Sequence, residues 1–168
     1  MPIVADTTVF RYLVVLEVTD ILPALFEHVL ISPAVCNELQ RASAPAVVRT
    51  WSANLPPWVR IQPPITPPDP MLRSLGDGEQ EAIQLMHEQQ APLLVTDDRQ
   101  AYNAALARSL PVTRTLRVLE MAAERGLLDF PTIVTRLRAA GFYTPEDVVE
   151  EMLARDAERK RRQSESQE

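Results

Sequence analysis

The sequence predicts an α/β fold in which helices cover both faces of a parallel sheet. Short apolar runs such as Ile3-Val4-Ala5 alternate along the chain with segments whose apolar residues recur at helical spacing. Strands that alternate with helices in this way are typical of parallel sheets. The 168 residues suit one domain with a hydrophobic core of its own.

The elements before the proline-rich segment follow this alternation. Apolar positions predict two helices within 8–27, the second with Asp20 as its cap and Pro23 early in it. Pro33 is expected to open the next helix, because proline is favoured at a first helical position. The predicted elements are strand 2–6, the helices within 8–27, strand 28–32, the helix that begins at Pro33, and a further helix within 44–55.

Residues 55–70 are rich in proline and predict a stiff, extended connection with a small strand at 58–61. We interpret this segment as an internal loop, because the strand–helix pattern resumes after it. The elements predicted there are helix 76–90, strand 92–96, helix 98–110, strand 111–113, helix 116–126 closed by Gly126, and helices 130–140 and 145–160. The charged, polar end of the chain predicts a domain over 1–153 and a disordered tail over 154–168.

The composition excludes several classes of function. One cysteine, Cys36, rules out an internal disulfide and a cysteine-based zinc site, and two histidines far apart in the chain argue against histidine-rich metal chemistry. The net charge of −6 argues against binding nucleic acid through a global positive field. With four glycines and no G-x-G-x-x-G motif, a dinucleotide site has no support. No apolar run approaches the ~18 residues of a membrane span, and the N-terminus lacks a basic signal-peptide region, so we expect a cytoplasmic protein.

Acidic residues follow the predicted strands. Asp6 ends the first strand, and Asp97 and Asp98 end the strand at 92–96, while Glu38 and Glu79 lie in helices that follow other segments. Each alone has an ordinary interpretation as a helix cap, a first-turn acid or a solvated residue. Together they can converge on one edge of a parallel sheet, the edge where ligands bind. Carboxylates brought together repel one another unless a hard cation such as Mg²⁺ or Mn²⁺ neutralises them. Two such ions about 4 Å apart can promote phosphodiester hydrolysis.

Six segments then carry a family resemblance. They are IVADTT (3–8), ISPAVCNELQR (31–41), LGDGEQEAI (75–83), LLVTDDRQA (93–101), LPVTRTLRVLEMAAERGLL (110–128) and LRAAGFYTPEDVVEEML (137–153). In this order they resemble the PIN-domain family of metal-dependent ribonucleases, which includes the VapC-type toxins. The last segment is similar to a little-studied bacterial and archaeal branch of that family. The resemblance implies a three-layer α/β/α sandwich with a central parallel sheet.

The resemblance also implies a site and a chemistry. Mg²⁺ or Mn²⁺ would be bound by Asp6 as the central ligand, by Glu38 and Glu79, and by one or both of Asp97 and Asp98. The metal would activate a water that cleaves single-stranded or structured RNA. Which aspartate is the direct ligand stays open at this point, because one ends the strand and the other matches a T-x-D pattern.

Further side chains are implied near this site. Thr8 would place a hydroxyl near the metal. Arg114 and Arg117 stand where the family has glycines, and they are either RNA contacts or ordinary surface residues. Arg99 and Arg11 are either RNA contacts or ion-pair partners that ease the repulsion between carboxylates.

The functional prediction is a cytoplasmic, Mg²⁺- or Mn²⁺-dependent ribonuclease. The resemblance implies a homodimer and an antitoxin protein as partners, with the chain as the toxin of the pair. The alternative is a catalytically silent PIN-fold binding module. A receiver-like or phosphatase-like domain is discounted, because Asp6 is followed by two threonines and the only lysine, Lys160, lies near the end of the chain.

Overall fold

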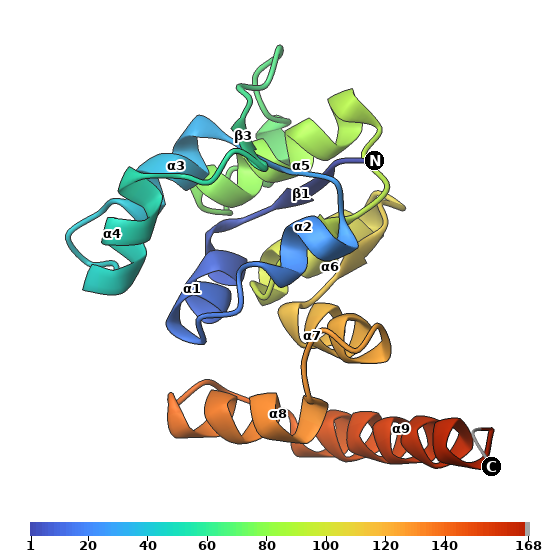
Figure 1. The fold of residues 1–168 in the computed structure, drawn as a ribbon. Helices are drawn as coiled ribbons and strands as arrows, with labels where there is room; N and C mark the ends of the chain where they lie inside the picture. Colours follow the sequence, from blue (N-terminus) through green and yellow to red (C-terminus); the bar gives the residue numbers. More distant parts are fainter. Residues whose placement is uncertain (167–168) are drawn as a thin grey trace. The chain divides into compact units, whose positions relative to one another are not determined.

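The computed structural model describes residues 1–166 and divides them into two compact units, Met1–Thr115 and the chain from Leu116 onward. The first unit contains a five-stranded sheet in the order β3-β2-β1-β4-β5, and each neighbouring pair is parallel (Figure 1). Its strands are β1 (Ile3–Ala5), β2 (Val29–Ile31), β3 (Val59–Ile61), β4 (Leu94–Val95) and β5 (Val112–Thr113). The predicted α/β sandwich with a parallel sheet is confirmed.

The central strands are short and are buried along their whole length. Every residue of β1 and β2 is buried, as is each residue of β4. Val4 pairs with Leu30 on one side and with Leu94 on the other. In the sheet, β2 and β3 lie on one side of β1, and β4 and β5 lie on the other. The strand order therefore reverses between β1 and β4, which is the place where open parallel sheets bind ligands.

Helices connect these strands by crossovers. Parallel crossovers are right-handed almost without exception, so the connections that lead to β2 and β3 lie on one face and those that lead to β4 and β5 on the other. The helices of the first unit are α1 (Thr7–Val15), α2 (Ile21–Leu25), α3 (Pro33–Leu39), α4 (Ala46–Ala53), the 3₁₀ helix η1 (Pro70–Leu72), α5 (Asp77–Gln89) and α6 (Arg99–Ala107).

Helix caps explain where several of these helices start. Ser32 accepts a hydrogen bond from the Val35 amide at 3.1 Å, and Pro33 occupies the first helical position of α3 as predicted. Asp20 stands at the N-cap of α2, but its side chain makes no capping hydrogen bond. The predicted cap is wrong in this respect, because the Asp20 backbone is helical rather than extended and does not aim the carboxylate at the following amides.

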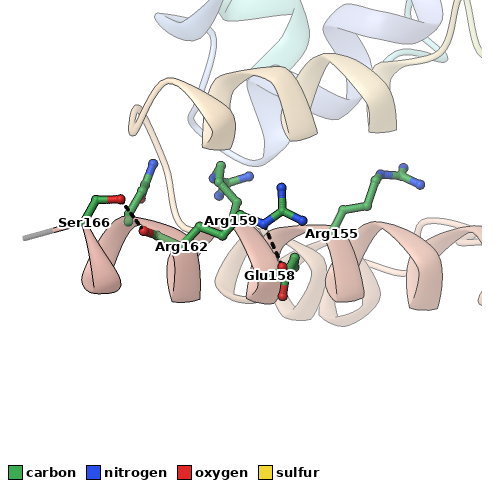
Figure 2. A pocket seen from close by; sticks show the side chains of 6 residues that line it. Arg155, Glu158, Arg159, Arg162 and Ser166 are labelled. Carbon is green, nitrogen blue, oxygen red and sulfur yellow. Dashed lines mark hydrogen bonds and ion pairs between the residues drawn. The ribbon is translucent and has the colours of Figure 1, made fainter.

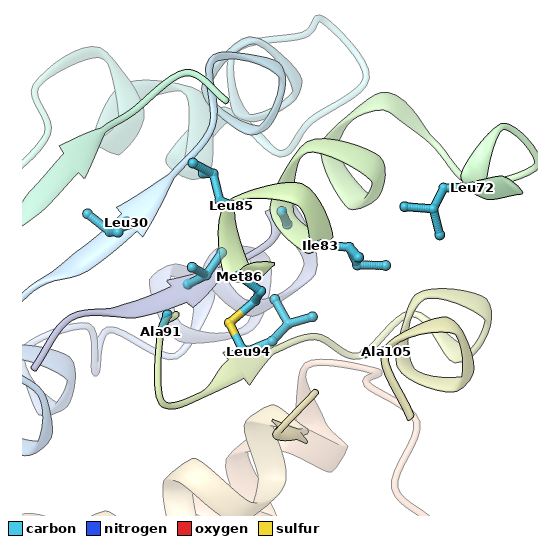
Figure 3. Close-up of a cluster of buried hydrophobic side chains, with 10 residues drawn as sticks. Leu30, Leu72, Ile83, Leu85, Met86, Ala91, Leu94 and Ala105 are labelled. Atoms are coloured by element: carbon cyan, nitrogen blue, oxygen red, sulfur yellow. The ribbon is translucent and has the colours of Figure 1, made fainter. Parts of the chain in front are cut away.

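The hydrophobic core on the α5 side of the sheet is continuous from β2 to α6. Figure 3 shows Leu85 and Met86 of α5 among strand residues such as Leu30 and Leu94. Leu85 and Met86 lie one turn after Ala82 and Ile83, so the buried stripe of α5 follows helical spacing. This packing fixes α5 over β1 and β4 and thereby places the start of α5 at the carboxyl edge of the sheet.

The second unit is helical. It comprises α7 (Thr115–Glu124) from its second residue, α8 (Phe130–Ala139) and α9 (Glu146–Glu165). Asp129 caps α8 by accepting from the Thr132 amide at 3.1 Å. Phe130, Ile133, Val134 and Leu137 of α8 and Val149 and Met152 of α9 are buried.

The charged end of the chain differs from the prediction. We expected a disordered tail over 154–168, but α9 continues through this segment to Glu165. Acidic and basic side chains three or four positions apart pair along the helix, as Glu158 does with Arg161 at 2.9 Å and with Arg162 at 2.7 Å. The expected disorder is therefore wrong for residues 154–165, and residues 167 and 168 lie outside the described chain.

No helix within residues 1–166 combines the length and the apolar character that a membrane span requires.

Candidate functional site

The candidate site begins where β1 and β4 end side by side. Asp6 follows β1, and its amide donates to the Val95 carbonyl of β4 at 3.2 Å. Asp6 is 1% exposed and is the N-cap of α1. A carboxylate is thus buried at the reversal of strand order, where the sequence predicted it.

Threonine hydroxyls hold both oxygens of Asp6. Its Oδ1 accepts from the Thr8 amide at 3.0 Å and from the Thr8 hydroxyl at 2.5 Å. Its Oδ2 accepts from the Thr96 hydroxyl. Burial raises the pKa of Asp6 to about 7, against the lowering effect of the two threonines, and the charges of Asp97 and Glu79 raise it further. The ionised form of Asp6 is therefore disfavoured, both by burial and by the neighbouring acidic side chains.

Glu38 lies in α3 and reaches across to the start of α5. Its Oε1 accepts from the Gly78 amide at 3.0 Å, and its Oε2 accepts from the hydroxyl of the buried Thr7. A Cβ on Gly78 would lie 2.5 Å from Oε2 of Glu38, so any larger residue at this position would require the Glu38 carboxylate to move. The sequence prediction named Glu38 but missed Thr7 and Gly78.

Glu79 lies in the first turn of α5, one residue after Gly78. Burial is the main reason that its pKa is raised, and the charges of Glu38 and Asp98 add to the rise, while main-chain hydrogen bonds oppose it. Its Oε2 would lie 2.2 Å from a Cβ on Gly76, so the carboxylate folds back toward the N-cap residue of α5. Glu79 is thus within electrostatic reach of Glu38, Asp98 and Asp6.

Asp97 and Asp98 have different surroundings. The Asp97 amide donates to the Thr8 hydroxyl at 3.0 Å, and its carboxylate accepts from the amide of Thr115 at 3.0 Å and from its hydroxyl at 2.5 Å. Burial raises the pKa of Asp97 although Thr115 and Arg114 oppose the rise. Asp98 caps α6 by accepting from the Ala101 amide at 2.8 Å. The capping role expected for one of the pair belongs to Asp98, and the ligand role of either stays a prediction.

Each of three carboxylates is held by threonine hydroxyls. The hydroxyls of Thr8 and Thr96 donate to Asp6, that of Thr7 donates to Glu38, and that of Thr115 donates to Asp97. Only Thr8 was predicted. For Thr7 and Thr96 the available signal was a threonine beside an acid in ADTT and VTDD.

The chemical type of the donor atoms fits a hard divalent cation, but the carboxylates are too far apart to hold one as they stand. Asp6, Glu38, Glu79 and Asp97 offer oxygen atoms only, which suits Mg²⁺ or Mn²⁺. Burial raises the pKa values of Asp6 and Glu79, and repulsion from neighbouring carboxylates adds to both shifts, a condition that a cation would relieve. Within residues 1–166, however, no three acidic, histidine or cysteine side chains are close enough together to hold a metal. Instead, the carboxylate oxygens of Asp6, Glu38 and Asp97 accept hydrogen bonds from threonine hydroxyls and main-chain amides.

The four predicted basic residues divide into different environments. Arg114 donates from Nη1 to the Asp97 carbonyl at 3.0 Å and lies over the Tyr102 ring. Arg117 pairs within α7 with Glu120 at 2.6 Å and Glu124 at 2.8 Å. Arg99 is an exposed first residue of α6. The Nε of Arg11 is buried without a hydrogen-bond partner among residues 1–166.

Comparisons with known proteins agree with this fold. The DUF3368 family model, described as a PIN domain, matches residues 2–158. A similar solved structure is a PilT N-terminus domain protein, SSO1118, from the hyperthermophilic archaeon Sulfolobus solfataricus P2. It is 16% identical, the match covers 73% of this chain and 93% of that one, and the TM-score is 0.50. A search of curated proteins finds no match. Since the family model spans most of the sequence, the chain belongs to the PIN-domain family.

Proposed function

We propose that this PIN domain is a divalent-metal-dependent ribonuclease. PIN domains are generally nucleases, and they usually bind divalent metals. The observation that carries the proposal is the burial of Asp6 at the reversal of strand order, with its pKa raised to about 7 and other carboxylates adding to the rise. The buried charge of such a carboxylate lowers the stability of the fold at neutral pH, so its presence favours a binding or catalytic role.

In this proposal Asp6 would be the central ligand of Mg²⁺ or Mn²⁺, Glu38 of α3 and Glu79 of α5 would also hold the ion, and Asp97 would complete the set. When bound, the cation activates water and neutralises charge that develops on the phosphate during hydrolysis. The chain's own contribution is to orient the carboxylates. Thr8 fixes Asp6 relative to Asp97, because its hydroxyl donates to the first and accepts from the amide of the second.

The deciding experiment is RNA cleavage with Mg²⁺ or Mn²⁺ against EDTA, for the wild type and two variants. Asp6→Asn is expected to abolish cleavage. Asp77→Asn is the matched control, since Asp77 is an exposed acid at the start of α5 and the substitution removes the same charge. Metal-dependent cleavage that survives in Asp77→Asn and is lost in Asp6→Asn supports the proposal. Equal cleavage by wild type and Asp6→Asn contradicts it.

A catalytically silent binding module is the second candidate, and one observation favours it. The carboxylates are already satisfied by hydroxyl and amide donors and do not converge within the described residues. This candidate predicts neither cleavage nor metal binding. Titration calorimetry with Mn²⁺ distinguishes the two, because the nuclease requires binding that Asp6→Asn weakens.

The partners of the nuclease are proposed on the family resemblance. We infer an RNA substrate, a homodimer and an antitoxin, with the chain as a cytoplasmic toxin. Light scattering after size-exclusion chromatography tests the dimer, since a mass near one chain of 18.9 kDa contradicts it. Growth arrest on expression, absent for Asp6→Asn, tests the toxin.

A further inference from the structure

Arg114 is a cation that the fold holds in place at the edge of the acidic site. It follows β5 directly, and its Nη1 donates to the main-chain carbonyl of Asp97 at 3.0 Å. Its guanidinium carbon lies 4.4 Å from the centroid of the Tyr102 ring. A carbonyl on one side and an aromatic ring on the other orient the guanidinium before any ligand arrives.

Neither of these contacts neutralises the charge of Arg114. A carbonyl and a ring face are polar partners, whereas a carboxylate would cancel the charge. Within residues 1–166 Arg114 forms no direct ion pair with a carboxylate. The Asp97 carboxylate is near enough for Arg114 to lower its pKa, but Thr115 makes its hydrogen bonds. The Arg114 guanidinium is therefore held in position, and its remaining N–H groups donate to no carboxylate of the described chain.

The larger group of basic residues, on α9, is different. Figure 2 shows the hollow lined by Arg155, Arg159 and Arg162, with Glu158 among them. Arg162 pairs with Glu158 at 2.7 Å, Arg155 pairs with Glu120 at 2.8 Å, and Arg159 pairs with Asp156. Each of these arginines already pairs with a carboxylate of the same unit, so their positions are explained by ion pairs within α9 and between α9 and α7.

We propose that Arg114 binds a phosphate of a nucleic acid strand that lies along the carboxylate cluster. The inference rests on the proposed nuclease function and names the residue that would contact its substrate. A polyanion that approaches Asp6, Glu79 and Asp97 is repelled, and a fixed positive charge at the same edge offsets part of that repulsion. Arginine suits this role because its planar fork matches two phosphate oxygens.

The position of Tyr102 supports phosphate rather than base recognition. Arg114 covers a face of the Tyr102 ring, so that face is not offered to a nucleobase. The contact would be independent of base identity, and single-stranded RNA of mixed sequence is therefore a suitable probe. Tyr102 is a positioning residue in this scheme, since it acts through the orientation of Arg114.

The test is the binding of a fluorescein-labelled single-stranded RNA by anisotropy. All proteins carry Asp6→Asn, so that the probe stays intact. Arg114→Ala is compared with Arg60→Ala, which removes the same charge from an exposed residue of β3, at the opposite edge of the sheet. We expect Arg114→Ala to raise the Kd about ten-fold and to lower the salt slope by about one, while Arg60→Ala changes the Kd less than about two-fold.

Two further variants guard against a folding defect. Arg114→Lys keeps the charge without the fork and should recover part of the affinity, and Tyr102→Leu should weaken binding although it removes no charge. Equal binding by the Arg114→Ala and Arg60→Ala proteins overturns the proposal for Arg114, even if the wild type cleaves RNA. Reduced binding by Arg114→Ala with no cleavage by the wild type supports Arg114 and overturns the nuclease. Failure of every protein to bind RNA overturns both.

Discussion

Thr115 holds both oxygens of the Asp97 carboxylate. Its amide donates to Oδ1 at 3.0 Å, and its hydroxyl donates to Oδ2 at 2.5 Å. Asp97 lies two residues after the end of β4, and Thr115 is the first residue of α7. The start of α7 therefore orients an acidic side chain of the candidate site. The two contacts also oppose the rise in the pKa of Asp97 that burial produces.

Replacing Thr115 with valine is expected to weaken metal binding. The substitution keeps the shape and the amide but removes the hydroxyl, so Asp97 loses one of its charge-assisted hydrogen bonds. Groups that orient metal ligands in this way are typically worth about 10- to 100-fold in metal affinity or activity. Mn²⁺ affinity by calorimetry and RNA cleavage are the measurements. Thr115→Ser keeps the hydroxyl and should stay within a few-fold of wild type; equal affinities for the valine and serine variants would show that the hydroxyl has no such role.

Gly78→Ala is expected to destabilise the protein through Glu38. A Cβ at this position would lie 2.5 Å from Oε2 of Glu38, whose carboxylate is fixed by Thr7 and by the Gly78 amide. In an unobstructed helix the same change stabilises by roughly 0.5–1 kcal/mol. We therefore expect a loss of about 1–2 kcal/mol in the free energy of unfolding, measured by urea denaturation.

A double-mutant cycle isolates the cause of this loss. With Glu38→Ala in the background the obstruction is gone, and Gly78→Ala should then stabilise the protein. A loss of the same size in both backgrounds would place the cause in the backbone rather than in the Glu38 carboxylate.

The sequence predicted the positions of those acids that local pattern determines. Asp6, Asp97 and Asp98 lie at the sheet edge as expected, because a buried apolar run that ends in an acid places the acid there, and their role as ligands stays a prediction. The hydrogen bonds of Thr115 to Asp97 and of Gly78 to Glu38 join positions 18 and 40 residues apart. They depend on how closely Thr115 approaches Asp97 and how closely α3 approaches the start of α5, and no local periodicity encodes those distances.

At the end of the chain, the sequence predicted disorder where the structure has a helix. The charged composition of this segment predicted disorder, but the order of the charges matters more than their number. Glu158 lies three and four positions before Arg161 and Arg162, and it pairs with both. A count of charged residues does not distinguish this arrangement from a solvated coil.

Glu120→Gln is expected to destabilise the helical unit that follows Thr115. Glu120 is 1% exposed, and its carboxylate accepts from Arg117 at 2.6 Å and from Arg155 at 2.8 Å. Removing one member of a buried ion pair costs about 3–5 kcal/mol, and the exposure of the two arginines places the expected loss near the low end or below it. Hydrogen exchange of α9 amides should report the loss directly.

Glu124→Gln is the matched control for this prediction. Glu124 also pairs with Arg117, at 2.8 Å, but its side chain is 41% exposed, and we expect a change within about 0.5 kcal/mol. The pKa of Glu120 is lowered in the folded chain by the two arginines, against the opposing effect of burial. Its stabilisation is therefore present above the unfolded pKa and is lost as the pH falls through the folded pKa, so acid should diminish the difference between wild type and Glu120→Gln.

Asp6→Asn is expected to stabilise the metal-free protein at neutral pH while it removes cleavage. Burial raises the pKa of Asp6 from its ordinary 3.8 to about 7, so above pH 7 the folded chain holds a buried charge that the unfolded chain solvates. At about 1.4 kcal/mol for each pH unit, the rise corresponds to on the order of 4 kcal/mol at most. Asparagine carries no charge and keeps an oxygen that can accept from Thr8.

The sign of the pH dependence follows from proton linkage. Between the unfolded pKa near 3.8 and the folded pKa of about 7, the folded state binds more protons than the unfolded state. The contribution of Asp6 to stability is therefore largest in acid and is lost as the pH rises through this window. Thermal unfolding in EDTA from pH 4 to pH 8 should show the midpoint of the wild type falling relative to that of Asp6→Asn, and saturating Mn²⁺ should reverse the order at pH 8 by stabilising only the wild type. Parallel curves for the two proteins in EDTA would mean that Asp6 is not an electrostatic cost to the fold, and the main argument for a cation at this site would be lost.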